Sequence, residues 1–275
     1  MGTVTTEKMR PHVSVVRLNR PERLNAMSIE LCLELKGALE EVGRDNDSRV
    51  VVLTGAGRAF CSGLDLKDHS VIPNMEGLTV PRIGPRAIRI YSELTPTMRH
   101  LPQPIIAAVN GVAYGGGLCL AIAADLRIAS RSALFNATGI VNGLTSTELG
   151  VSWLLPRLIG AANANDILLT GRRVDADEAL RMGLVSRVVS DDDLLEHALD
   201  VASGMCEYSP YGVQMTKQVI WANLENTSLA AAIELEDRNQ IMLGMTDNLP
   251  EAIRAFDEKR KPVYTDQPRK NVYRD

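Results

Sequence analysis

The chain has few of the residues and patterns that mark specialised classes of protein. Aromatic side chains make up 4% of its 275 residues, and its four cysteines form no C-x-x-C pair. The cysteines and the four histidines are scattered, so no metal site is expected. No apolar stretch approaches the ~20 residues that a membrane-spanning helix needs. Because the N-terminus also has no charged-then-apolar signal segment, we expect a cytoplasmic protein with free thiols and no membrane association.

An excess of positive charge is also missing. The formal net charge is −4 and there is no long basic run, which argues against a nucleic-acid partner. Apolar residues make up 45% of the chain, enough for a sizeable core built mainly from Leu, Ile, Val, Ala and Met. The net charge does not exclude a small anionic ligand, because individual Arg and Lys side chains can bind phosphate on an acidic protein.

Short β-branched runs separated by helical patterns occupy the first 190 residues. Strands are predicted at residues 13–18, 50–53, 105–109, 126–129 and 184–189. Because helical segments connect these runs, the pattern predicts an α/β fold with crossover connections rather than hairpins.

The chain beyond residue 191 contains no strand-like run. Helices are predicted at residues 192–208, 210–223, 229–244 and 250–261. The predicted organisation is a loose N-terminus over residues 1–10, an α/β core over 11–200, a C-terminal helical region over 201–262 and a tail over 263–275.

Two glycine-containing turns follow two of the predicted strands. Gly115, Gly116 and Gly117 precede a good helix former at residues 118–125, and a second turn spans residues 57–65. Glycine lets the backbone approach a ligand closely, and a helix N-terminus offers free N–H groups. Each turn taken alone is well explained as a tight structural loop. Together, at strand ends in one α/β body, they can direct two backbone N–H groups at one carbonyl oxygen, such as that of a thioester enolate.

Five segments in order along the chain carry a recognisable pattern. They are residues 18–26 (LNRPERLNA), 55–66 (GAGRAFCSGLDL), 104–117 (PIIAAVNGVAYGGG), 155–160 (LPRLIG) and 255–262 (AFDEKRKP). Over residues 10–264 the chain resembles the crotonase superfamily, the enoyl-CoA hydratase/isomerase family of fatty acid metabolism. The resemblance implies a spiral of ββα repeats with a C-terminal helical trimerisation region. It also implies a homotrimer or a dimer of trimers that binds an acyl-CoA thioester, with coenzyme A as part of the substrate and no separate cofactor.

The resemblance also implies roles for particular residues. By position, the backbone N–H groups of Leu64 and Gly116 hold the thioester oxygen and stabilise the enolate. The family commonly contacts coenzyme A through the turn before the first helix and through residues around the first N–H donor, which here are Arg23, Leu24, Ala26, Asp65, Leu66 and Lys67. Arg23 and Lys67 are candidates for the phosphates, with an ordinary solvated surface role as the alternative.

Two positions depart from the hydratase pattern. Hydratases of the family use two glutamates to handle one water molecule, and the matching positions here are Cys119 and Gly139. A cysteine just inside a helix is more often a small buried apolar residue than a catalytic thiol. These departures argue against ordinary two-glutamate hydration.

Glu148, eight residues before Pro156, matches an acidic position of the family's enoyl-CoA and dienoyl-CoA isomerases. One base suffices to move a proton between two carbons, so the resemblance favours double-bond isomerisation with Glu148 as the base. The alternative is a capping box, with Thr145 as the N-cap and Glu148 reaching back.

Two other hypotheses remain open at this point. One is a different crotonase reaction, such as hydration, decarboxylation or thioester hydrolysis, with atypical residues. The other is a catalytically silent acyl-CoA-binding protein. Asp68, His69 and Asp125 are minor candidates for auxiliary roles, and Asp125 resembles a structural aspartate at the end of the glycine-rich helix.

Overall fold

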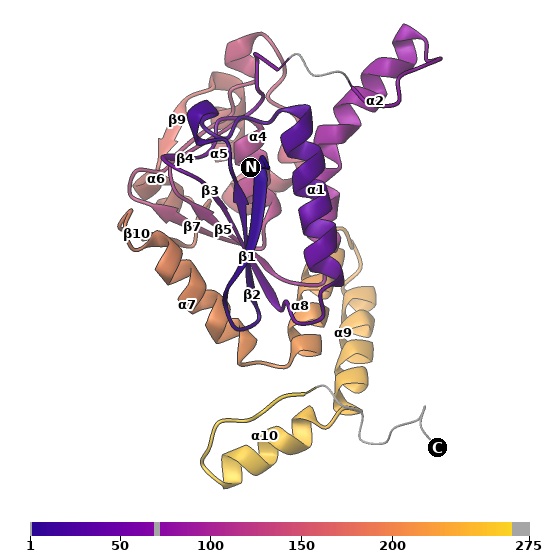
Figure 1. The fold of residues 1–275 in the computed structure, drawn as a ribbon. Coiled ribbons are helices and arrows are strands. Elements are labelled where there is room, and N and C mark those ends of the chain that lie inside the picture. Colours follow the sequence, from indigo (N-terminus) through magenta and orange to yellow (C-terminus); the bar gives the residue numbers. More distant parts are fainter. Residues whose placement is uncertain (1, 69–71, 266–275) are drawn as a thin grey trace.

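The computed structural model describes residues 2–68 and 72–265, so His69 and residues 266–275 of the tail lie outside the described residues. Two β-sheets form the body (Figure 1). The larger has the strand order β1-β2-β3-β5-β7-β10, and its strands are β1 (Val4–Arg10), β2 (Val13–Leu18), β3 (Val50–Gly55), β5 (Ile105–Val109), β7 (Leu126–Ser130) and β10 (Arg187–Val189). All neighbours in it are parallel except the antiparallel pair β1 and β2.

The smaller sheet has the order β4-β6-β8-β9, with β4 (Ala59–Cys61), β6 (Val112–Tyr114), β8 (Leu134–Asn136) and β9 (Arg173–Asp175). In this sheet β4 follows β3 closely along the chain, β6 follows β5 and β8 follows β7. Each turn of the chain therefore adds one strand to each sheet, which is the spiral of ββα repeats that the resemblance predicts.

Ten α-helices and two 3₁₀ turns are found in the described residues. The helices are α1 (Ile29–Arg44), α2 (Val80–Ser92), α3 (Leu94–His100), α4 (Gly116–Ala123), α5 (Val151–Thr170), α6 (Ala176–Arg181), α7 (Leu194–Cys206), α8 (Pro210–Asn223), α9 (Leu229–Gly244) and α10 (Asn248–Asp257), and the 3₁₀ turns are η1 (Pro21–Arg23) and η2 (Ile140–Asn142). None of these helices is long and apolar enough to cross a membrane.

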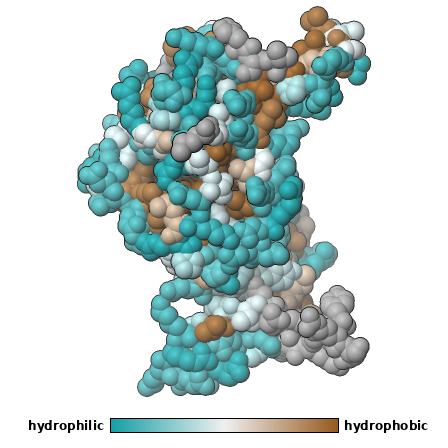
Figure 2. All heavy atoms as spheres, viewed as in Figure 1, coloured by the Kyte–Doolittle hydropathy of each residue, from teal (hydrophilic) through white to brown (hydrophobic). Residues whose placement is uncertain are grey.

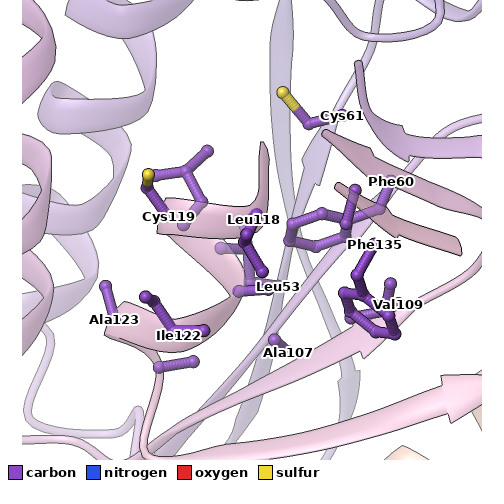
Figure 3. Packing of buried hydrophobic residues seen from close by; sticks show 14 of the residues in the cluster. Leu53, Phe60, Cys61, Ala107, Val109, Leu118, Cys119, Ile122, Ala123 and Phe135 are labelled. Carbon is purple, nitrogen blue, oxygen red and sulfur yellow. The ribbon is translucent and has the colours of Figure 1, made fainter. Parts of the chain in front are cut away.

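The larger sheet is apolar on both faces because its central strands lie between helices. Alternate residues of β3 point in opposite directions, as the pleat of a strand requires. Val50 and Val52 pack in a cluster with α7, whereas Val51 and Leu53 join the main core with α1, α3 and α4. Figure 3 shows part of that core, where α4 packs beside the two sheets. This burial on both faces explains why the strand sequence shows no apolar–polar alternation.

The structure corrects the sequence prediction at several points. The first ten residues are not loose, because residues 4–10 form β1 and pair along β2. The four strands of the smaller sheet were not predicted, and the strand expected at 184–189 is limited to 187–189. Helices α8 and α9 have the predicted bounds.

A buried polar cluster joins the C-terminal helices to the end of α4. Lys217 of α8 contacts Asp125 at 2.9 Å and donates hydrogen bonds to two main-chain carbonyl oxygens. Trp221 donates to the other oxygen of Asp125 at 2.6 Å, and Asp125 also accepts from the N–H of Ile105. Burial lowers the pKa of Lys217, against the opposing effect of Asp125. Asp125 is therefore a structural residue, as its position suggested.

Candidate active site

In the turn after β4, the backbone N–H of Leu64 is not used in pairing with the neighbouring segment. Met27 forms a parallel bridge with Leu64, in which the N–H of Met27 donates to Gly63 at 2.7 Å and Met27 accepts from the N–H of Asp65 at 3.1 Å. In such a bridge the residue between the two bonded groups points its own N–H to the opposite side. The N–H of Leu64 therefore points away from Met27.

The second turn supplies another free N–H. Gly116 is the first residue of α4, so its N–H has no acceptor within the helix. The two turns touch: a Cβ on Gly63 would lie 3.5 Å from the nitrogen of Gly116 and 2.7 Å from the carbonyl oxygen of Tyr114. Gly63 has φ +91°, so only glycine fits both its conformation and this close approach. The structure thus brings together the two turns that carry Leu64 and Gly116.

Asp65 anchors the first turn from inside. Its carboxylate accepts from Arg23 at 2.6 Å and from Arg20 at 2.9 Å, and its side chain is only 3% exposed. Burial by itself raises the pKa of this carboxyl, but hydrogen bonds from the two arginines and a backbone N–H outweigh it and lower the pKa. The carboxylate is thus occupied within the protein. Asp65 positions the turn, and Arg20 is a member of this cluster that sequence reasoning missed.

The other residues expected at coenzyme A surround the same cluster. Leu24 adopts a left-handed conformation at the end of η1, and the carbonyl oxygen of Ala26 accepts from Arg20 at 2.6 Å. Leu66 and Lys67 are exposed, and the N–H of Lys67 donates to Asp65. In the described residues the ammonium group of Lys67 has no ion pair, so it is available to an anionic ligand.

Glu148 does not cap a helix. Helix α5 begins at Val151 with Gly150 as its N-cap, and no side chain caps it. The predicted capping box at Thr145 is therefore wrong, because two residues with turn geometry, Leu149 and Gly150, separate Glu148 from the helix. Instead, Oε1 of Glu148 lies 3.3 Å from the position of a Cβ on Gly115, the residue just before Gly116. Burial raises the pKa of Glu148, which suits a group that gives and takes protons.

The two positions of the hydratase glutamates hold no base. Cys119 is buried, its Sγ lies 3.5 Å from the main-chain oxygen of Glu148, and burial raises the pKa of its thiol well above the usual value. Figure 3 shows Cys119 on α4 and Cys61 on the smaller sheet. A Cβ on Gly139 would come within 2.8 Å of the carbonyl carbon of Thr145, so this turn has no room for any side chain.

The minor candidates serve structural roles or lie outside the described residues. The carboxylate of Asp68 accepts from the N–H of Ile29 at 2.8 Å and so caps the start of α1. Thr138, which sequence reasoning missed, lies at the site: its Oγ1 is 2.6 Å from the position of a Cβ on Gly115. No motif identifies it, since it stands in a turn that differs from the family pattern.

A two-sheet spiral of ββα repeats, in which the turns that carry Leu64 and Gly116 lie side by side, is the architecture of the crotonase superfamily. The sequence model of the family "Enoyl-CoA hydratase/isomerase" matches residues 8–267. A probable enoyl-CoA hydratase of Mycobacterium bovis is 49% identical to this chain, over 97% of this chain and 94% of the relative. A probable enoyl-CoA hydratase of Mycobacterium tuberculosis is 48% identical over the same shares of the two chains.

Solved structures agree with this match. A probable enoyl-CoA hydratase/isomerase from Mycobacterium abscessus superposes with a TM-score of 0.92 at 46% identity, covering 97% of this chain and 100% of that one. A monofunctional enoyl-CoA isomerase from M. smegmatis has a TM-score of 0.72 at 44% identity, covering 85% and 99%. The chain therefore belongs to the enoyl-CoA hydratase/isomerase family, and it is an acyl-CoA enzyme, a lyase or an isomerase.

Proposed function

We propose that the enzyme shifts a double bond in an unsaturated acyl-CoA by single-base proton transfer. The observation that carries this proposal is the place of Glu148, whose carboxyl oxygen lies beside Gly115 at the start of α4. Among the described residues this carboxyl group has no hydrogen bond or ion pair. The neighbouring Cys119 and Gly139 supply no second base, which favours a reaction that needs only one.

The proposed reaction converts a 3-enoyl thioester into the conjugated 2-enoyl thioester. Glu148 takes a proton from carbon 2, and the electron pair delocalises onto the thioester oxygen. The N–H groups of Leu64 and Gly116 stabilise the negative oxygen of this dienolate. Protonated Glu148 then returns the proton to carbon 4, so no water enters and the atoms balance.

A panel of thioesters tests this proposal. The purified enzyme should convert 3-enoyl-CoA to 2-enoyl-CoA, seen as the rise in ultraviolet absorbance of the conjugated thioester. Crotonyl-CoA should not be hydrated at a comparable rate. Hydration as fast as isomerisation would contradict the single-base mechanism, and saturable acyl-CoA binding without turnover would instead indicate a silent binding protein.

We further propose that the coenzyme A moiety lies along η1 and the turn at residues 64–67, in contact with Arg23, Leu24, Ala26, Asp65, Leu66 and Lys67. Lys67 is exposed and Arg23 is one-third exposed, so both cations can reach phosphate groups. Two observations support this proposal. The ammonium group of Lys67 has no ion pair in the described residues, and members of the family commonly bind coenzyme A through this turn.

Replacing Lys67 by alanine should raise KM for acyl-CoA about threefold, as expected for the loss of one exposed charge pair. The matched control is the same variant assayed with the acyl-pantetheine thioester, which lacks the nucleotide phosphates. Its KM should not change. An equal rise in KM for both substrates would show that Lys67 does not recognise phosphate.

The oligomeric state is proposed from the C-terminal helices. No residue of α9 is buried, and Phe256 of α10 is 83% exposed. A groove of about 830 Å³ lies between α5, α8, α9 and α10, away from Leu64, Gly116 and Glu148. Exposed apolar surface of this kind marks a protein interface.

We expect a homotrimer or dimer of trimers, with a mass about three or six times the chain mass of 30.0 kDa in sedimentation. A monomer in this measurement would contradict the proposal.

A further inference from the structure

Two side-chain oxygens face the same spot beside the start of α4. A Cβ on Gly115 would lie 2.6 Å from Oγ1 of Thr138 and 3.3 Å from Oε1 of Glu148. Thr138 follows β8 and is half-buried, whereas Glu148 comes from the loop before α5. In the part of the chain that the structure describes, neither oxygen has a hydrogen-bond partner. The two groups therefore lie close together, ready to pair with each other or with a substrate.

The loop that joins these residues is held firmly. Ser146 donates to the carbonyl oxygen of Ala137 and accepts from the N–H of Ile140, both at 3.0 Å, so one hydroxyl ties the two sides of the loop together. The carbonyl oxygen of Thr138 also accepts from the N–H of Asn142 at 3.1 Å. These bonds fix the backbone on both sides of Thr138, so the place of its hydroxyl is set by the fold.

We propose that Thr138 is a positioning residue for Glu148, whose carboxylate accepts a hydrogen bond from the Thr138 hydroxyl in the substrate complex. The bond would hold the carboxylate against the turn at Gly115 and stabilise its charged form in a half-buried place. Hydrogen bonds between catalytic groups commonly tighten only when the substrate binds. This inference rests on the proposed function, because it assigns Thr138 to the same proton transfer.

The thiols near Glu148 are uncharged, so they do not compete with Thr138 for an interaction with the Glu148 carboxylate. Cys119 of α4 and Cys61 of β4 both lie near the carboxylate. Burial raises the pKa of both thiols, to about 12 for Cys61, so neither ionises at the working pH. Thr138 is thus the neighbouring donor that can respond to the charge on Glu148.

The test compares Thr138→Val, which removes the hydroxyl and keeps the shape, with Thr138→Ser, which keeps the hydroxyl. Thr138→Val should lower kcat for isomerisation about 10- to 100-fold with little change in KM, as expected for the loss of a hydrogen bond to a charged group. The kinetic pKa of the base should rise in the same variant. Thr138→Ser should retain both the rate and the pH profile of the wild type.

The outcomes separate the two proposals. If Thr138→Val keeps the wild-type kcat and pH profile while Glu148→Gln is inactive, the role of Thr138 is wrong and the proposed function stands. If Thr138→Ser loses as much activity as Thr138→Val, the hydroxyl is not what matters, which also overturns the inference. If Thr138→Val fails to fold, Thr138→Ala replaces it. The kcat and pH profile of Thr138→Ala are then compared with those of Thr138→Ser by the same criteria. Isomerisation that survives in Glu148→Gln refutes the proposed function itself.

Discussion

Glu148→Gln should lower kcat for double-bond isomerisation by about 10²- to 10⁴-fold, the usual contribution of a positioned general base. Glutamine has nearly the same shape and fills the same place beside Gly115, but it cannot accept the proton from carbon 2. The two N–H donors are untouched, so binding of the acyl-CoA should change little. Exchange of the carbon-2 hydrogen with deuterated solvent, followed by NMR, measures the proton transfer directly.

The same substitution should stabilise the fold at neutral pH. Burial raises the pKa of Glu148 above its ordinary value of 4.5, so the folded state binds the proton more tightly than the unfolded state. The free energy of unfolding therefore falls as the pH rises from the ordinary pKa of a glutamate through the raised pKa of Glu148, because charging the buried carboxyl group opposes folding. Glu148→Gln removes this cost, and its Tm should exceed that of the wild type well above pH 4.5 but not below it.

A surface carboxylate provides the matched control. Glu76 is exposed in the loop before α2. Glu76→Gln removes the same charge elsewhere, and both its kcat and its pH–stability profile should follow the wild type. Retention of full isomerase activity in Glu148→Gln would show that another group moves the proton.

Gly63→Ala should reduce kcat by about 10²- to 10³-fold, as expected when one donor of an oxyanion hole is displaced. The added Cβ would approach the carbonyl oxygen of Tyr114 to 2.7 Å, and φ +91° is unfavourable for alanine. Because rigid backbone lies on the other side, the turn itself must shift, and the N–H of Leu64 shifts with it. Single-turnover kinetics with a saturating acyl-CoA separates this effect from weaker binding.

Gly77→Ala controls for the backbone conformation. Gly77 also has a positive φ, +73°, but a Cβ there would meet nothing within 4 Å. The substitution therefore costs conformational strain without any close contact, and Gly77 lies outside the turns that carry the donors. Its kcat should remain at the wild-type level. An equal loss in both variants would mean that general strain, rather than the place of Leu64, lowers the activity of Gly63→Ala.

The parts of the fold that sequence reasoning predicted are those with long, consistent signals. The strand at 105–109 is a continuous β-branched and alanine run, and α8 and α9 extend over 14 and 16 residues, respectively. The strands of the smaller sheet have only three residues each, too few to show a period. Residues 4–10 read as polar because β1 lies at the sheet edge and pairs on one side only.

Of the candidate site, sequence reasoning could predict the two glycine-containing turns. Glycine marks a close approach, so the turns carrying Leu64 and Gly116 could be placed from sequence. Glu148 and Thr138 lie ten residues apart on a loop whose path no local pattern specifies. The spacing of Thr145 and Glu148 mimics a helix cap, yet the left-handed Leu149 and Gly150 delay the helix to residue 151.

The crowding at Gly139 limits how this enzyme can evolve. Installing glutamates at positions 119 and 139 would restore the residue types of a two-glutamate hydratase with two substitutions. The second of these would place a side chain against the main chain of Thr145 and Ser146, which are fixed in the loop that also carries Glu148. A glutamate at position 139 would therefore require this loop to be rebuilt as well.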